Sequence, residues 1–316
     1  MATTLTGERS EKQKNPSPDT LINEPPPMST ISETDLIINP DGSVYHLNLK
    51  PEHISDKIIT VGDPGRVHRV SSHFDNVDFE MNKREFITHT GTYKGQRITV
   101  ISTGMGTDNV EILLNELDAV FNIDLKTRQI KEKKTSLKII RIGTSASIQE
   151  DMRLGSHVIS EYGIGLDPMI HFYQMQMPEY EASICEALQN DIGLPYLPYC
   201  VKGSEQLLDL FKDNMVLGNT VTCHGFYAPQ GRTLRLPIRY PDLVEKLTYF
   251  HKDNFWLTNL EMETAGYYGL SKLLGHEMIS LNAIIANRIR NKFSKDPNKV
   301  IDALIRKVLD KIITLS

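Results

Sequence analysis

Residues 137–149 read LKIIRIGTSASIQ, and this stretch decides the fold. Its first six residues run largely apolar around Arg141, as a strand buried in an α/β sheet does. The strand is then expected to break at Gly143, where small hydroxyl residues begin. Ligands of open α/β sheets bind at the carboxyl edge of the strands. Backbone N–H groups, hydroxyls and Arg141 therefore predict a cradle for an anion such as phosphate. The alternative is a tight turn beside a surface arginine.

Composition narrows the class of protein. The chain has 316 residues, 40% hydrophobic and 24% charged, which suits a globular protein with a sizeable core. A formal net charge of -5 argues against a broad nucleic-acid surface. The 3 cysteines lack CxxC spacing, which argues against a disulfide framework and favours a reducing compartment. No apolar run could span a bilayer, and no secretory signal begins the chain. We expect a cytoplasmic protein without nucleic-acid or membrane partners.

Strand and helix patterns alternate on both sides of the opening stretch. Strands are predicted at 57–61, 86–93, 97–102, 155–162, 215–222, 255–260 and 278–286. Helices are predicted at 67–74, 109–120, 179–188, 241–250, 266–274 and 298–313. This order predicts one α/β domain over residues 35–316, with a central mixed, mostly parallel twisted sheet flanked by helices. Residues 1–34 are rich in Thr, Ser, Glu, Lys and Pro and predict a disordered polar tail.

Glycine, hydroxyl and charged residues recur just after the predicted strand ends. They stand at 62–66, 103–107, 143–149, 261–263 and 287–288. Each alone is explained equally well by an ordinary turn, because turns favour the same residue types. Since parallel strands end at one edge of a sheet, the recurrence favours a single shared ligand site.

Taken together, these stretches resemble the nucleoside phosphorylase family of the purine/uridine phosphorylase type, and within it the uridine phosphorylases. The resemblance extends from about Tyr45 to the C-terminus. It rests on GDPGRV at 62–67, REF at 84–86, STGMG at 102–106, RIGT at 141–144, FY at 226–227, QGR at 230–232, EME at 261–263 and NR at 287–288. It implies a pentosyltransferase that converts uridine and inorganic phosphate into uracil and ribose 1-phosphate in pyrimidine nucleoside salvage. It implies no cofactor beyond phosphate as co-substrate.

The resemblance also implies how phosphate and ribose are held. The phosphate ligands would be Gly62, Arg66, Arg141, Thr144 and, from a neighbouring subunit, Arg84. Guanidinium groups match phosphate geometry. The ribose ligands would be Thr144, Met262, Glu263 and, from a neighbouring subunit, His46. Shared sites imply a homo-oligomer, either a dimer or a hexamer built of dimers. Alone, Arg84 is explained as a surface charge, His46 as a structural histidine and Glu263 as an acid that favours a helix N-terminus.

The base site implied by the resemblance consists of Phe226, Gln230, Arg232, Arg288 and Ala146. Gln230 offers a donor and an acceptor to the uracil edge, and Arg232 can stabilise the negative charge of the departing base. Catalysis would therefore rest on Arg232 and Gln230 together with Arg141. Purine-cleaving relatives carry an Asp near the end of the late strand, whereas residues 284–288 read IIANR. Without that general acid, a pyrimidine is favoured. The alternative is a polar loop with one buried aromatic residue.

Two departures from the family pattern leave alternatives open. Ala146 stands where the family has glycine, so another nucleoside such as deoxyuridine, thymidine or a purine nucleoside is the second hypothesis. A non-catalytic nucleoside-binding protein on the same fold is the third. Bacterial relatives hold a potassium ion between subunits with a Glu and a Ser. Glu85 matches the Glu, but Asn109 replaces the Ser, so no metal is predicted.

Overall fold

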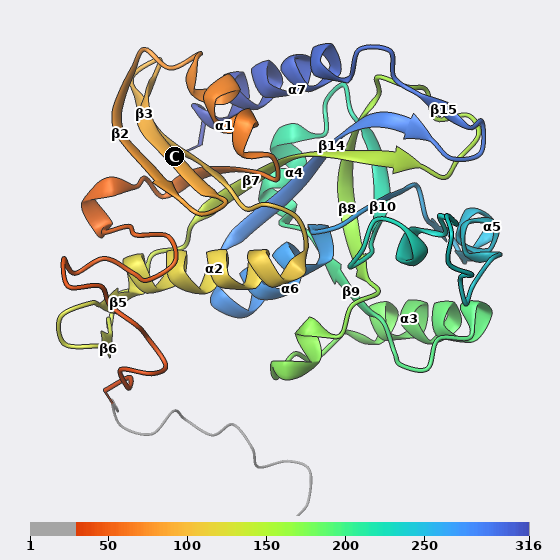
Figure 1. The fold of residues 1–316 in the computed structure, drawn as a ribbon, viewed down its shortest axis with the longest axis horizontal. Coiled ribbons are helices and arrows are strands. Elements are labelled where there is room, and N and C mark those ends of the chain that lie inside the picture. The colour runs from red at the N-terminus through yellow and green to blue at the C-terminus, as the bar shows by residue number, and fades with distance from the viewer. Residues whose placement is uncertain (1–29, 316) are drawn as a thin grey trace, which may run out of the picture.

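The computed structural model describes residues 30–315 (Figure 1). The predicted tail, residues 1–34, lies outside the described residues except for residues 30–34. In that short part, the Ile31 N–H donates to the carbonyl oxygen of Arg128 at 3.0 Å. The Arg128 guanidinium in turn donates to the carbonyl oxygen of Leu36. Residues 31–36 therefore pack against Arg128, which lies in the segment between α2 and β7.

Eleven strands within the described residues form one sheet. They lie in the order β15-β14-β8-β10-β13-β7-β1-β4-β3-β2, and β9 pairs with β8. Their bounds are β1 (Lys57–Val61), β2 (Asn76–Lys83), β3 (Phe86–Tyr93), β4 (Gln96–Ser102), β7 (Lys138–Ser147), β8 (His157–Gly165), β9 (Tyr199–Lys202), β10 (Val216–Thr222), β13 (Asn259–Glu261), β14 (Glu277–Asn287) and β15 (Lys292–Phe293). Two hairpins stand apart, β5 (Ile123–Asp124) with β6 (Gln129–Ile130) and β11 (His251–Lys252) with β12 (Phe255–Trp256).

The strand pairings close on themselves around β7. This strand pairs with β14 in parallel and with β13 in antiparallel orientation. β14 pairs with β8, β8 with β10 and β10 with β13, so these five strands complete a circuit. β1 joins β7 and β4 in parallel and connects the circuit to the antiparallel β2–β3–β4 meander. The predicted α/β fold with a mixed sheet is confirmed.

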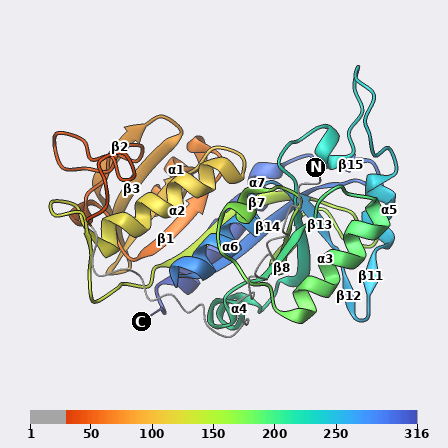
Figure 2. The same cartoon turned by 90° about the horizontal axis from the view of Figure 1, so that it is seen from below.

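Helices cover the sheet on several sides (Figures 1 and 2). The α-helices are α1 (Pro64–Ser71), α2 (Thr107–Asn122), α3 (Glu179–Ile192), α4 (Glu205–Phe211), α5 (Leu243–Tyr249), α6 (Thr264–Leu274) and α7 (Pro297–Ile312), and the short 3-10 helices are η1 (Pro51–His53), η2 (Met169–Phe172) and η3 (Ala228–Gln230). α2 and α6 lie side by side below the sheet in Figure 1, and α7 packs across β7 and β14. No helix of the described residues is both long and apolar enough to cross a membrane.

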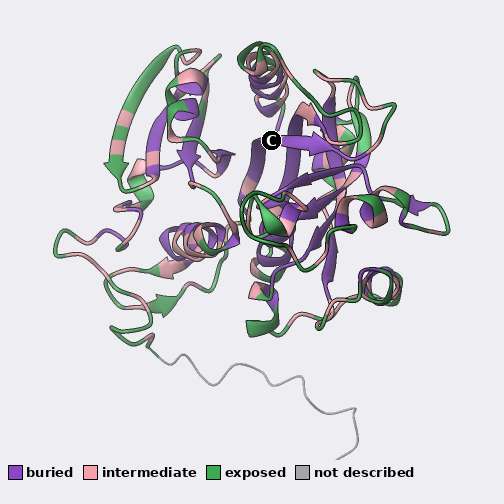
Figure 3. Cartoon of the chain, turned by 45° about the vertical axis from the view of Figure 1, so that its right-hand side comes forward, coloured by how far each residue is buried: buried purple, intermediate pink, exposed green. Residues whose placement is uncertain are grey.

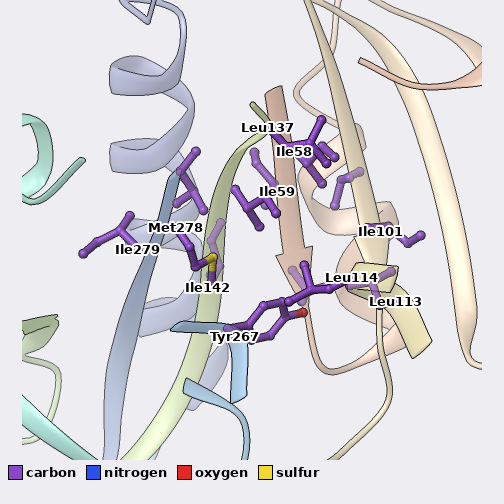
Figure 4. Packing of buried hydrophobic residues seen from close by; sticks show 14 of the residues in the cluster. Ile58, Ile59, Ile101, Leu113, Leu114, Leu137, Ile142, Tyr267, Met278 and Ile279 are labelled. Atoms are coloured by element: carbon purple, nitrogen blue, oxygen red, sulfur yellow. The ribbon is translucent and has the colours of Figure 1, made fainter. Parts of the chain in front are cut away.

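The core is formed by the strands and the inner faces of these helices (Figure 3). All five residues of β1 are buried, as expected for a strand of a sheet that is covered on both faces. Figure 4 shows Ile58 and Ile59 of β1 in one cluster with Leu114 of α2 and Met278 of β14. Burying each such side chain contributes about 1.5–3 kcal/mol. β1 pairs with the first half of β7, so the carboxyl end of β1 lies beside Ile142, in the middle of β7.

The structure corrects several local expectations. The strand that starts at Lys138 does not break at Gly143, because residues 143–147 continue the ladder with β14 and its last two residues also pair with β13. The predicted strand at 255–260 is two short strands, β12 and β13, and α5 begins at Leu243 instead of residue 241. β2, β9 and α4 were not predicted.

A close packing contact at Gly165 gives the first testable prediction. A Cβ atom added there would lie 2.1 Å from the Cε1 and Cζ atoms of Tyr199, whose ring is fully buried. The ring cannot swing away freely, since its hydroxyl donates to the Asp167 carboxylate at 2.8 Å. We expect Gly165→Ala to lower the free energy of unfolding by about 1–3 kcal/mol, as overpacking does. Urea denaturation measures this, and an unchanged midpoint would contradict the packing.

Candidate active site

A cavity of about 730 Å³ opens where the strands of the circuit and β1 end. It is built from the segments after β1 and β4, the second half of β7, the turn before η3, the β13–α6 junction and the β14–β15 hairpin. Of the predicted site residues, the cavity brings together Gly62, Arg66, Arg141, Thr144, Ala146, Phe226, Gln230, Arg232, Met262, Glu263 and Arg288. The stretches singled out in the sequence therefore line one cavity, and its role as a ligand site stays a prediction.

The turn from β1 into α1 forms one end of the cavity. Asp63 caps α1 by accepting from the Gly65 N–H at 2.9 Å, which fixes the turn. Arg66 is buried and donates from Nη1 to the carbonyl oxygen of Ile142 at 3.0 Å. Its Nε has no hydrogen-bond partner among residues 30–315. Burial lowers the pKa of Arg66 to about 10, so the group stays charged at neutral pH. This end can attract an anion.

Arg141 lies at the centre of a buried polar network. Its Nη1 donates to the Ser280 hydroxyl at 3.1 Å and to Asn282 Oδ1 at 3.0 Å, both on β14. Its Nη2 donates to Glu263 Oε2 at 2.5 Å and lies 2.9 Å from Glu261 Oε2. Burial alone would lower the pKa of Arg141, but the two carboxylates outweigh it and raise the pKa. Its role as a phosphate ligand stays a prediction, and the surface arginine alternative is wrong.

Glu263 joins this network to the turn before α2. Its Oε1 accepts from the Gly106 N–H at 2.8 Å, while Oε2 accepts from Arg141. Burial raises the pKa of Glu263, and Arg141 opposes this rise. A carboxylate held by a guanidinium and a backbone N–H keeps lone pairs for further donors. Its fixed position beside Met262 is suitable for accepting hydroxyl groups of a bound ligand.

Gln230 and Arg232 form the other end of the cavity. Arg232 Nη1 donates to Gln230 Oε1 and to the carbonyl oxygen of Phe226, each at 2.6 Å, and its Cζ atom lies 3.8 Å from the centroid of the Phe226 ring. Arg288 donates to the carbonyl oxygen of Gln230 at 2.8 Å. Burial and the neighbouring Arg288 lower the pKa of Arg232 to about 10. No carboxylate of the described chain lies within 4.0 Å of either guanidinium.

Ala146 lies between these two ends. It is buried in β7 and pairs with Leu260 of β13 and Ala286 of β14. The ladder between β7 and β14 slips by one residue next to it, so that Ile285 is left out of the pairing and lines the cavity. Ala146 thus lines the cavity beside a bulge in the neighbouring strand.

His46 and Arg84 do not line the cavity of their own chain. They lie close to each other instead: the Tyr45 ring is 4.8 Å from that of His46, and Arg84 Cζ lies 5.8 Å above the same tyrosine. His46 Nδ1 lies 2.6 Å from Glu116 Oε1. Arg84 is exposed and adopts a positive φ of 54°, at the tip of the β2–β3 hairpin. That His46 and Arg84 contribute to the site of a neighbouring subunit stays a prediction.

Glu85 and Asn109 come together beside Gly104, which lines the cavity. A Cβ atom added to Gly104 would lie 2.7 Å from Asn109 Nδ2 and 3.2 Å from Glu85 Cγ. Glu85, which matches the potassium ligand of bacterial relatives, and Asn109, which replaces the expected Ser, are thus neighbours. No group of three or more His, Cys, Asp or Glu side chains suited to a metal occurs within residues 30–315.

Several residues that line the cavity, or that bind its lining residues, were not predicted. Ser280 and Asn282 bind Arg141 from inside a strand that looked wholly apolar, and no local signal distinguishes them. Glu261 was noted only as part of the EME motif, although it lies against Arg141. The hairpin residues Asn291, Lys292 and Phe293 also line the cavity. Asn291 has a positive φ of 50°, which asparagine tolerates in turns. The asparagine itself is the sequence signal that could have located the hairpin.

Comparisons with known proteins agree with this geometry. A sequence model of the phosphorylase superfamily matches residues 56–312. A uridine phosphorylase from Thermococcus kodakarensis is 28% identical over 82% of this chain and 83% of its own. A DeoD-type purine nucleoside phosphorylase from Buchnera aphidicola is 25% identical over 86% of this chain and 100% of its own. The crystal structure of a Trypanosoma brucei nucleoside phosphorylase with uridine phosphorylase activity superposes with a TM-score of 0.82 at 29% identity, covering 89% of this chain and 100% of that one. The chain therefore belongs to the phosphorylase superfamily, as a pentosyltransferase of the nucleoside phosphorylase kind.

Proposed function

We propose that this nucleoside phosphorylase acts on uridine, releasing uracil and forming ribose 1-phosphate. The observation that carries the proposal is the pairing of Gln230 with Arg232 at one end of a cavity whose other end holds Arg66 and Arg141. In this reaction a phosphate oxygen bonds to C1′ while the bond from C1′ to the base nitrogen breaks. The base departs with the electron pair and later takes a proton from water. The protein must therefore hold an anion at each end.

The chemistry of the base end supports a pyrimidine. The Gln230 side chain offers Oε1 as an acceptor and Nε2 as a donor, which match the donor and acceptor on the edge of uracil. Arg232 can donate to a carbonyl oxygen that gains negative charge. The carboxylates that line the cavity are Asp63, Glu261 and Glu263, which belong to the β1 turn and the β13–α6 junction. The end of β14 supplies Asn287 and Arg288 instead. A departing purine would therefore lack a carboxylic acid there to protonate it.

Uracil release from uridine, measured with and without inorganic phosphate, tests the proposal. We expect release to require phosphate and to yield ribose 1-phosphate in equal amount. Release that ignores phosphate would instead indicate hydrolysis, and uridine binding without product would indicate a non-catalytic protein.

A second candidate is a preference for another nucleoside, such as deoxyuridine, thymidine or a purine nucleoside. The buried methyl group of Ala146, beside the bulge at Ile285, favours this candidate because it narrows the space between the two ends. A panel of nucleosides assayed at equal phosphate concentration separates the two candidates. Uridine should give the highest kcat/KM, and a higher value for inosine or thymidine would replace uridine as the substrate.

We also propose that two subunits share each site, in a dimer or a hexamer of dimers. The exposed Arg84 and the half-buried His46 lie close together and do not line their own cavity, and the charge of Arg84 is available to a neighbour. Residence in the cytoplasm is proposed as well, since the three cysteines are buried and free, as a reducing compartment allows.

Subunit complementation tests the sharing of sites. Arg84→Ala and Arg232→Ala should each be poorly active alone. A mixed dimer of the two has one site with both arginines, so re-association of an equal mixture should restore about a quarter of wild-type activity, because half of the dimers are mixed and each holds one intact site of two. Re-associated single variants are the controls. Absence of any recovery in verified mixed dimers would show that Arg84 does not serve the neighbour.

A further inference from the structure

Glu261 is the last residue of β13, and only 2% of its side chain is exposed. Its carboxylate accepts from the Thr222 hydroxyl at 2.6 Å, from the Glu263 N–H at 2.9 Å and from the Thr264 N–H at 3.0 Å and 3.1 Å. Oε2 also lies 2.9 Å from Arg141 Nη2. One carboxylate thus connects β10, the start of α6 and the buried guanidinium of β7.

These contacts leave Glu261 few lone pairs for a ligand. A carboxylate accepts about four hydrogen bonds. Thr222, Glu263 and Thr264 occupy most of these sites, and Arg141 faces Oε2. Glu263, by contrast, accepts from Gly106 and Arg141 alone among the described residues. Glu261 therefore belongs to the support of the site, and Glu263 to its binding surface.

The two carboxylates share one guanidinium. In the proposed reaction Glu263 would accept ribose hydroxyls and Arg141 would bind phosphate, and both new contacts would compete with the contact between these two residues. Glu261 keeps its hold on both: it faces Arg141 through Oε2 and fixes the backbone of Glu263 through the N–H. A displacement of about 1 Å in such a group can cost a hundredfold in rate.

We infer that Glu261 is a positioning residue, which holds Arg141 and Glu263 in the geometry of the reaction without touching the substrates. The inference rests on the proposed function for the identity of the reaction. It differs from a purely structural role, in which the carboxylate would do no more than cap α6. A cap needs an acceptor for the Thr264 N–H, and an amide oxygen supplies one as well as a carboxylate does.

Glu261→Gln separates the two roles, because it keeps the shape and one acceptor oxygen and removes the charge that faces Arg141. The exposed Glu245→Gln on α5 is the matched control. We expect Glu261→Gln to keep the wild-type unfolding temperature within a few degrees and to lose at least tenfold in kcat/KM for both uridine and phosphate. The control should retain both constants. Equal constants in Glu261→Gln and wild type would overturn the inference.

The pH profile of kcat/KM gives a readout that a helix cap would not move. The charged and titratable groups facing Glu263 are Arg141 on β7, Glu261 on β13, Arg66 on α1 and Tyr267 on α6. Glu261 is the negative neighbour among them, so its charge helps to raise the pKa of Glu263. Removing that charge should move the acid limb of the profile to lower pH. An acid limb that stays in place would also overturn the inference.

Thr222→Val provides a second variant if Glu261→Gln does not fold. It removes the hydroxyl that donates to Glu261 and leaves the carboxylate charged. We expect kcat/KM to fall for both uridine and phosphate, by less than in Glu261→Gln. An unchanged kcat/KM for both substrates would count against positioning. If the wild type does not consume uridine, the proposed function fails separately. Calorimetry with inorganic phosphate then decides: weaker phosphate binding by Glu261→Gln supports positioning of Arg141, and equal binding refutes it.

Discussion

Replacing Arg232 by alanine is expected to lower kcat/KM for uridine by about a hundredfold to a thousandfold, the cost of removing one preorganised donor from a developing anion. The arginine is charged at neutral pH, partly buried and free of any carboxylate among the described residues. Its charge is therefore available to the departing base. Because Arg66 and Arg141 hold the opposite end of the cavity, KM for phosphate should change little.

Arg235→Ala is the matched control for this change. Arg235 is exposed on the same loop and does not line the cavity, so its removal takes away a positive charge nearby without removing the donor. Wild-type kinetics are expected. A uridine with an electron-withdrawing ring substituent should lose less activity in Arg232→Ala, since its base departs more readily as an anion. Equal losses for both nucleosides would mean that Arg232 binds the base without stabilising its departure.

The residues that line the cavity could be picked out from the sequence because their signal is short-range and repeated. Turn glycines and polar residues after strand ends can be recognised within a few residues, as at Gly62 after β1 and Gly104 after β4. The sheet then brings these ends to one edge, which any α/β fold of this order does. The family resemblance added the roles of Gln230 and Arg232, which no local pattern supplies.

The partners of Arg141 could not be predicted in the same way. Glu261 and Glu263 are about 120 positions away from Arg141 in the sequence, and Ser280 and Asn282 are further away still. Their proximity depends on β7 pairing with both β13 and β14, which follows from the closed circuit of strands. The same pairing carries β7 through Gly143 and on to Ser147, where a turn was expected. The long-range pairing of β7 is therefore the reason why neither the partners of Arg141 nor the continuation of β7 past Gly143 was predicted.

Gly143 is a position in β7 where the neighbouring side chains leave no room for a Cβ atom. A Cβ atom there would lie 2.0 Å from Arg141 Nη1, 2.6 Å from Arg141 Cζ and 2.8 Å from Asn282 Oδ1. The guanidinium therefore passes directly over the glycine on its way to the two carboxylates. The backbone of Gly143 is not in the left-handed region, so the need for glycine here is one of space alone.

Gly143→Ala should therefore displace Arg141 and lower kcat/KM by about a hundredfold to a thousandfold, since a charged group of the site is misplaced. KM for phosphate should rise together with KM for uridine, because Arg141 contacts Glu263 as well. The guanidinium end of an arginine can shift more easily than backbone can, so the protein should still fold, and thermal unfolding checks this. If a folded Gly143→Ala variant had the kcat/KM of the wild type, Arg141 could leave its place between Glu261 and Glu263 without consequence. The anion would then be held by Arg66 alone.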